Sequence, residues 1–262
     1  MRREAFETPG PLTLDIRVPS GDVELQAVEG TETVVQLSAS PELEDEARIE
    51  VHPKRDGHEV SVVIEKSSGL FRAMREDVRL RVTAPPGAGV EISTASADVD
   101  ARGEFGGVEV NTASGDVSFE TAGDVQVNSA SGDLKLGQVG GALTVNTASG
   151  DVEVGRLDGA GKVRSASGDV QLEEAVASLK VQTASGDVEV GSVREGDVVL
   201  QTASGDIEVG IKKGSKLWID AKSMSGETTS ELEIGDAPAE GDGPTVEVRA
   251  TAMSGDIRVK RA

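Results

Sequence analysis

Apolar and polar residues alternate along most of this chain, in short stretches separated by the tripeptide Ser-Gly-Asp or a close variant. Before the tripeptide, apolar residues stand two apart, as at Val108 and Val110. The same spacing returns after it, as at Val117 and Phe119. A period of two places alternate side chains on opposite faces, so each stretch is predicted to be a β-strand with one buried face. No stretch shows sustained helical periodicity, and the pattern therefore predicts an all-β protein.

The tripeptide recurs at a nearly constant interval, which indicates stacked units of one architecture. Outside the regular part of the repeat, copies also stand at Ser225-Gly226-Glu227 and Ser254-Gly255-Asp256, and one isolated copy, Ser20-Gly21-Asp22, comes before it. In the regular part the step is 17 to 19 residues, and the Asp column consists of Asp98, Asp116, Asp133, Asp151, Asp169, Asp187 and Asp206.

A unit of about 18 residues could form either a hairpin array or one coil of a β-solenoid. Parallel stacking places like residues on like at ~4.8 Å, and two further columns favour it. The alanine column is Ala95, Ala113, Ala130, Ala148, Ala166, Ala184 and Ala203. The hydroxyl column is Thr94, Thr112, Ser129, Thr147, Ser165, Thr183 and Thr202. We therefore predict a parallel β-solenoid with about 18 residues per coil, right-handed as strand crossovers in parallel sheets are.

The predicted organisation has three parts. Residues 1–89 form an irregular N-terminal β region that acts as a cap continuous with the solenoid. Residues 90–210 form the regular repeat, and residues 211–262 form longer C-terminal coils and a second cap, because terminal coils must protect their unpaired backbone. Strands in the first part are predicted at 12–18, 33–38, 59–65 and 78–83.

A family resemblance rests on these repeats. The hexapeptide Thr-Ala-Ser-Gly-Asp-Val at 112–117 and 147–152, together with Ser-Gly-Asp-Ile-Arg-Val at 254–259, resembles the DUF4097 family of bacterial adhesin-like β-solenoids. The resemblance runs from about residue 12 to the C-terminus. It implies the solenoid fold and an adhesin-like role, without an assigned enzymatic activity.

Composition narrows the function classes. The formal net charge of −21 argues against binding to nucleic acid or to anionic lipid. Without cysteine, disulfides and thiolate-ligated metals are excluded. No apolar run approaches a membrane span, and residues 1–6 lack the apolar stretch of a signal peptide. We expect a cytoplasmic protein without direct membrane insertion, or an envelope or secreted one if a leader has been removed.

The residues needed for catalysis are sparse, so we predict that the protein is not an enzyme and uses no cofactor. His52 and His58 are the only histidines and flank a predicted hairpin turn at 54–57. No Gly-x-Ser-x-Gly elbow, phosphate-binding loop or His-Glu-x-x-His motif occurs. Aromatic residues make up 2% of the chain, which argues against the platforms of a sugar-cleaving cleft.

The Asp column has two interpretations. Each carboxylate could accept backbone N–H groups within its own turn, with glycine supplying the backbone geometry. Alternatively, Asp98, Asp116, Asp133, Asp151, Asp169, Asp187 and Asp206 could bind calcium, which takes 6–8 oxygen ligands. The first interpretation is favoured, because the unit lacks the Gly-Gly-x-Gly-x-Asp pattern of calcium-binding rolls.

Two other groups are candidates for contacts. A column three residues before each serine could form a side-chain amide ladder or a solvated face; it comprises Asn111, Asn128, Asn146, Arg164, Gln182 and Gln201. The segment with Phe71, Arg72, Met74 and Arg75, continuing to Arg79 and Arg81, has the residue types of an interface core. It is either a docking element or a loop packed on its own strands.

The sequence therefore predicts a non-catalytic solenoid scaffold for an unidentified protein partner. One alternative is an adhesin module that uses the Asp column to bind calcium or polysaccharide. Another is a solenoid that assembles into filaments, although the irregular ends favour a monomer.

Overall fold

The computed structural model describes residues 1–64, 78–231 and 244–262. They form two compact units, Met1–Gly132 and Asp133–Ala262. Unit 1 contains β1 Arg2–Glu7, β2 Leu12–Ala27, β3 Glu32–Ser38, α1 Pro41–Glu46, β4 Arg48–Lys54, β5 Gly57–Val63, β6 Arg79–Ala84, β7 Gly89–Phe105, β8 Val108–Thr112, β9 Val117–Ala122 and β10 Val125–Ser129. Unit 2 contains β11 Leu134–Val139, β12 Leu143–Thr147, β13 Val152–Leu157, β14 Gly161–Ser167, β15 Val170–Ala175, β16 Leu179–Ser185, β17 Val188–Val193, β18 Gly196–Ser204, β19 Ile207–Ile211, β20 Lys216–Ser225, β21 Thr228–Ser230, β22 Thr245–Ser254 and β23 Ile257–Arg261.

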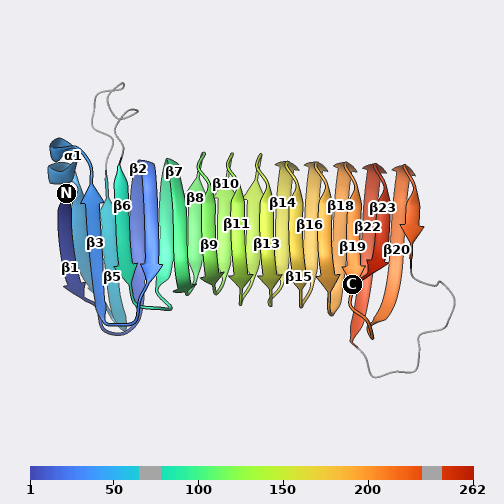
Figure 1. Cartoon of the computed structure of the whole chain (residues 1–262), viewed down its shortest axis with the longest axis horizontal. Coiled ribbons are helices and arrows are strands. Elements are labelled where there is room, and N and C mark those ends of the chain that lie inside the picture. Colours follow the sequence, from blue (N-terminus) through green and yellow to red (C-terminus); the bar gives the residue numbers. More distant parts are fainter. Residues whose placement is uncertain (65–77, 232–243) are drawn as a thin grey trace. The chain divides into compact units, whose positions relative to one another are not determined.

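Unit 2 is a stack of coils, each made of one strand before the Ser-Gly-Asp turn and one after it (Figure 1). The strands before the turn pair in parallel and form what we call the first sheet, in the order β12, β14, β16, β18. Those after the turn also pair in parallel and form the second sheet, in the order β11, β13, β15, β17, β19. Val163 lies opposite Val145 on one side and Val181 on the other. Like residues therefore stack on like, and the predicted all-β parallel β-solenoid is confirmed.

The core of unit 2 consists of thin aliphatic layers. Alternate residues of each strand point inward, and the core residues of both sheets are at most 2% exposed: Val145, Val163, Val181, Val154, Leu172 and Val190. A third column stands at the last residue of the second strand of each coil and is fully buried, with Val139, Leu157, Ala175, Val193 and Ile211. Burial of these apolar side chains is the main term that stabilises the stack.

Unit 1 is built around two long strands that each pass through the turn. The first half of β2 pairs with β5 and β7, and its second half pairs with β6 and β7, all in parallel. Strands β8 and β10 extend the first sheet, and β9 extends the second. The rings of Phe105 and Phe119 meet edge to face with centroids 6.0 Å apart inside this unit.

The isolated tripeptide near the N-terminus belongs to this stack. Residues 20–22 lie in register with residues 96–98, so Asp22 is opposite Asp98 although 76 residues separate them in sequence. The intervening chain forms the irregular side of unit 1, where pairing becomes antiparallel in β1–β3, β3–β6 and β4–β5. The predicted hairpin is confirmed, with Lys54 opposite Gly57.

A short helix, α1, was not predicted from periodicity. It spans six residues, fewer than two turns, which is too short for a helical period to emerge. Local signals do mark it: the side chain of Ser40 accepts a hydrogen bond from the Leu43 N–H, and Pro41 occupies the first turn. Leu43 is the buried residue that attaches the helix.

The last coils of unit 2 do not stack in chain order. Strand β22 pairs with β18 on one side and β20 on the other, and β23 likewise lies between β19 and β21. The final segment of the chain therefore inserts between two coils that precede it. This order explains why Asp256 keeps the motif residue while Glu227 departs from it: Asp256 supports a following coil, and Glu227 lies in the last one.

Glycine is required at the turn for two reasons. Gly168 has a φ of +116°, in the left-handed region that side chains disfavour. A Cβ atom at this position would also lie 2.2 Å from the carbonyl oxygen of Gly150 in the preceding coil. The turn therefore combines a positive φ with a backbone contact that no side chain permits.

Gly168→Ala is expected to lower the free energy of unfolding by more than about 2 kcal/mol, because strain and overlap add. Gly107→Ala is the matched control, since no atom lies within 4 Å of a Cβ atom there and its φ is not in the left-handed region. Urea unfolding followed by circular dichroism measures both. Equal effects would contradict the role given to the turn.

The alternation of inward and outward residues predicts a second contrast. Val145 is 1% exposed, whereas its neighbour Asn146 lies at the half-buried outer surface. Val145→Asp is expected to cost about 4 kcal/mol, because it buries an uncompensated charge. Asn146→Asp is expected to change stability by about 0.5 kcal/mol or less. Thermal melts of the two variants measure this, and similar melting temperatures would show the strand register to be wrong.

Candidate functional site

The hydroxyl column closes the turns. Thr147 Oγ1 donates to the carbonyl oxygen of Ser149 at 2.8 Å, and Ser165 Oγ donates to that of Ser167 at 2.9 Å. Thr183 makes the equivalent bond at 3.0 Å. Two members differ: Thr202 donates to the carbonyl oxygen of Gly186 in the preceding coil, and Thr94 accepts from the Ala97 N–H. All of these bonds are to the backbone, so the column serves the fold rather than a ligand.

The Asp column connects successive coils. The Asp169 N–H donates to Asp151 Oδ1 at 2.9 Å, and the Asp187 N–H donates to Asp169 Oδ1 at 2.8 Å. Unit 1 repeats the arrangement from Asp116 to Asp98 at 2.9 Å. The predicted bond within the same turn was therefore wrong for these pairs. The acceptor serves the next coil instead, because in-register stacking brings its N–H directly over the carboxylate.

A calcium site would require several oxygens free to surround one ion. In the Asp column, one oxygen of each carboxylate in these pairs is already occupied by a backbone N–H group. Among residues 1–64, 78–231 and 244–262, no group of three or more histidine or acidic side chains is arranged to hold a metal ion. The geometry supports a structural role for the column, and calcium binding stays a prediction.

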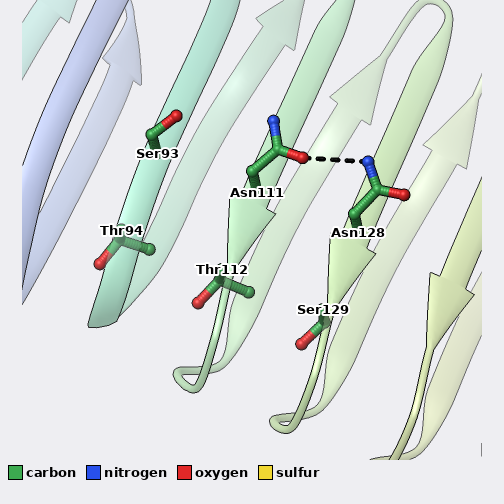
Figure 2. A pocket seen from close by; sticks show the side chains of 6 residues that line it. All are labelled: Ser93, Thr94, Asn111, Thr112, Asn128 and Ser129. Atoms are coloured by element: carbon green, nitrogen blue, oxygen red, sulfur yellow. Dashed lines mark hydrogen bonds between the residues drawn. The ribbon is translucent and has the colours of Figure 1, made fainter.

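A shallow polar hollow lies on the outer face of unit 1, over β7, β8 and β10. Figure 2 shows its lining of neutral hydroxyl and amide side chains: Ser93, Thr94, Asn111, Thr112, Asn128 and Ser129. Asn128 Nδ2 donates to Asn111 Oδ1 at 3.0 Å, and Asn111 Nδ2 donates to Glu109 Oε1 at 3.2 Å. The hollow, about 420 Å³, is widely open to solvent, so it suits a surface contact better than an enclosed small molecule.

The amide column is a ladder in part. The Asn111–Asn128 bond is one rung, and Gln182 Nε2 donates to Gln201 Oε1 at 2.7 Å in unit 2. Arg164 lies opposite Gln182 and Asn146 in the strand register. The column therefore presents amide groups on the outer face of each unit, interrupted by one cation in unit 2.

The predicted docking segment lies mostly outside the described residues. Phe71, Arg72, Met74 and Arg75 fall between residues 64 and 78. Its continuation is described: Arg81 Nε donates to Glu24 Oε2 at 2.8 Å, and Arg79 approaches Asp22 at 3.5 Å. These two arginines therefore neutralise acidic residues of the adjacent strand.

Ion pairs cover the outer face of the second sheet of unit 2. Lys135 Nζ lies 2.7 Å from Glu153 Oε2, and this hydrogen bond raises the pKa of Lys135. Arg156 contacts Asp158 and Glu174 at 2.8 and 2.6 Å, and its hydrogen bond lowers the pKa of Asp158. These charges are therefore compensated within the protein.

The family assignment comes from a family model that matches residues 12–260, the Toastrack DUF4097 model. The chain belongs to the Toastrack DUF4097 family. The resemblance seen in the repeats is thereby confirmed. No protein with a curated description matches this Toastrack chain.

Solved structures match this chain at low sequence identity. A "putative adhesin" from Parabacteroides merdae ATCC 43184 is 13% identical, with 98% of this Toastrack chain and 95% of that chain covered and a TM-score of 0.51. A "putative adhesin" from Bacteroides fragilis NCTC 9343 is 13% identical, with 100% and 96% covered and a TM-score of 0.36. A "putative lipid binding protein" from Parabacteroides distasonis ATCC 8503 is 10% identical, with 98% and 96% covered and a TM-score of 0.46.

The family match and the Parabacteroides merdae structure support the β-solenoid fold described above. In this Toastrack chain, His52 Nε2 lies 3.3 Å from Glu50 on β4, and His58 lies on β5 opposite Pro53. No helix among the described residues is long and apolar enough to cross a membrane.

Sequence reasoning identified the columns but missed the polar hollow and the coil-to-coil role of the Asp column. The hollow had a signal, because Asn111 and Asn128 recur at the same position in consecutive coils. The acceptor role had none, since the sequence cannot show which N–H group lies nearest to a carboxylate.

The Asp column yields a test with two variants of one residue. Asp169→Ala removes the acceptor for the Asp187 N–H and is expected to cost about 1–2 kcal/mol, the effect of one unsatisfied hydrogen-bonding group. Asp169→Asn keeps the acceptor and removes a negative charge from the column, so its stability is expected to stay close to that of the native chain.

Thermal melts with EDTA and with added calcium measure both effects. A rise in melting temperature with calcium that Asp169→Asn abolishes would favour the calcium alternative. Equal destabilisation by the two variants would contradict the hydrogen-bonding role.

Proposed function

We propose that this Toastrack chain is a non-catalytic scaffold that binds a protein partner on the outer face of β7, β8 and β10. The observation that carries the proposal is the polar hollow. Its donors and acceptors are held at strand spacing by in-register pairing, Asn111 opposite Ser93 and Asn128 opposite Asn111. A rigid array of this kind loses little conformational entropy on binding.

The chemistry of the hollow favours a protein over a sugar. None of the six lining side chains is aromatic, whereas sugar sites usually offer an aromatic platform. Amide and hydroxyl groups spaced by one strand match the backbone and polar side chains of a protein surface. The adhesin names of the structural neighbours support a binding role of this class.

Site-specific photo-crosslinking in the native host cells tests the proposal. Gln126 is exposed on β10 beside the hollow and receives the photoreactive residue. Gln171, exposed on β15 of the other sheet, receives it in the matched control. We expect a discrete protein adduct from position 126 that is absent from position 171 and is identified by mass spectrometry.

A second variant links the adduct to the hollow. Asn111→Leu with Asn128→Leu removes the amide pair and is expected to reduce the adduct at least tenfold, provided that its melt remains cooperative. The same adduct from both positions, or one that survives loss of the amides, would overturn the proposal.

A further inference from the structure

Three exposed cations on the outer face of unit 2 have no acidic partner. Lys162 and Arg164 lie two residues apart on β14, and Lys180 lies directly opposite Lys162 on β16. None of the three side chains makes a hydrogen bond or ion pair within the described part of the chain. We call these residues the cationic cluster.

The neighbouring positions do not neutralise this cluster. In the strand register, Lys162 is next to Thr144, Lys180 is next to Val199, and Arg164 is next to Asn146 and Gln182. Two like charges one strand apart repel by about 1 kcal/mol in water. The cluster carries this cost although the chain has a formal net charge of −21, so an anionic surface from outside would relieve it.

The equivalent positions in unit 1 carry the opposite charge. Lys162 and Lys180 each lie three residues before a member of the hydroxyl column. In unit 1 the same position is occupied by Glu91 and Glu109, which are exposed and lie opposite each other on β7 and β8. The Glu91 side chain makes no hydrogen bond or ion pair in the described residues, although the Lys54 ammonium group lies near enough to attract it electrostatically, and the Glu109 side chain accepts only from Asn111. We call Glu91 and Glu109 the acidic pair.

The two sets match in spacing because one repeat generates both. Each has two like charges separated by one strand step, ~4.8 Å. Two residues further along the same strands, the acidic pair is followed by Ser93 and Asn111 of the polar hollow. The corresponding position on β14 is Arg164, whose guanidinium has five N–H donors for hydroxyl and amide acceptors.

We propose that the partner is a second copy of this chain, with the cationic cluster of one copy docked on the acidic pair and polar hollow of the other. Lys162 and Lys180 face Glu91 and Glu109, and Arg164 enters the hollow. This inference rests on the proposed function and names its partner. A second copy is favoured over another anionic surface because its charges have the same spacing and lie beside a hollow of matching hydrogen-bonding character.

Charge reversal with complementation tests this contact. The first variant carries Lys162→Glu and Lys180→Glu, and the second carries Glu91→Lys and Glu109→Lys. Sedimentation at 50 and 300 mM salt, over a thousandfold range of concentration, measures the mass of each. We expect the native chain to rise above 27.0 kDa at low salt and both variants to bind themselves at least tenfold more weakly.

The equimolar mixture of the two variants is the decisive sample. Every contact between unlike copies again pairs glutamate with lysine, so association is expected to return. Lys213→Glu with Arg261→Glu is the control, because both residues are exposed and the net charge changes by the same amount as in the first variant. This control is expected to associate like the native chain.

A monomeric native chain at all concentrations, or a mixture that fails to associate, would overturn the self-contact. If the native chain is monomeric and binds a heparin column through Lys162 and Lys180, the cluster serves an anionic polymer and the inference is wrong. An adduct at position 126 that contains a different protein would preserve the proposed function while rejecting the second copy. An adduct with the chain itself supports both.

Discussion

In-register parallel stacking is the constraint on which the rest of this structure depends. Each coil can bond to the next only if its strands rise by one strand spacing and keep the same register. The Ser-Gly-Asp turn enforces that register. Its glycine allows the backbone of one coil to lie against a carbonyl oxygen of the preceding coil. Its aspartate accepts a hydrogen bond from a backbone N–H group of the next coil. A shift by one residue would turn the apolar face of the strand outward.

The same constraint decides how charge is distributed. Stacking like on like multiplies any charged position into a column, so a column of carboxylates needs a compensating interaction. In the Asp column the backbone N–H groups supply it. On the second sheet of unit 2, several acidic residues form ion pairs with lysine or arginine, such as Lys135–Glu153 and Arg156–Glu174. Where neither hydrogen bonds from the backbone nor ion pairs compensate the charge, as at Lys162 and Lys180, the positive charge is available to a partner.

Regularity also explains why the candidate site is a surface rather than a cleft. Small aliphatic residues fill the interior, with Val139, Leu157 and Val193 fully buried at one corner. In the described part of the chain these side chains fill the inside of the coils, and the regularly spaced polar groups lie on the outer surface. In the hollow over β7, β8 and β10, residues of the hydroxyl and amide columns line one surface without a charged side chain between them. Binding by this architecture depends on the spacing of exposed groups.

The strand pattern, the turns and the register could be predicted from the sequence, because each is a local or periodic property. Val145 and Asn146 were placed on opposite faces by a period of two, and the repeat of Gly150 and Gly168 specified the turns. The helix at 41–46 was too short to produce a period. The motif at residues 20–22 could be recognised in the sequence, but the pairing of Asp22 with Asp98, which places it in the stack, could not.

The sequence by itself determined that the chain forms a parallel solenoid, because a fixed repeat can bury its apolar face only by stacking on itself. Only the tertiary structure decided the order of the last coils and the acceptor role of the Asp column. It also decided which outward groups meet in the hollow. The physical reason is the same in each case. Periodicity specifies which face a residue occupies, whereas the identity of its neighbour depends on how coils distant in sequence are packed.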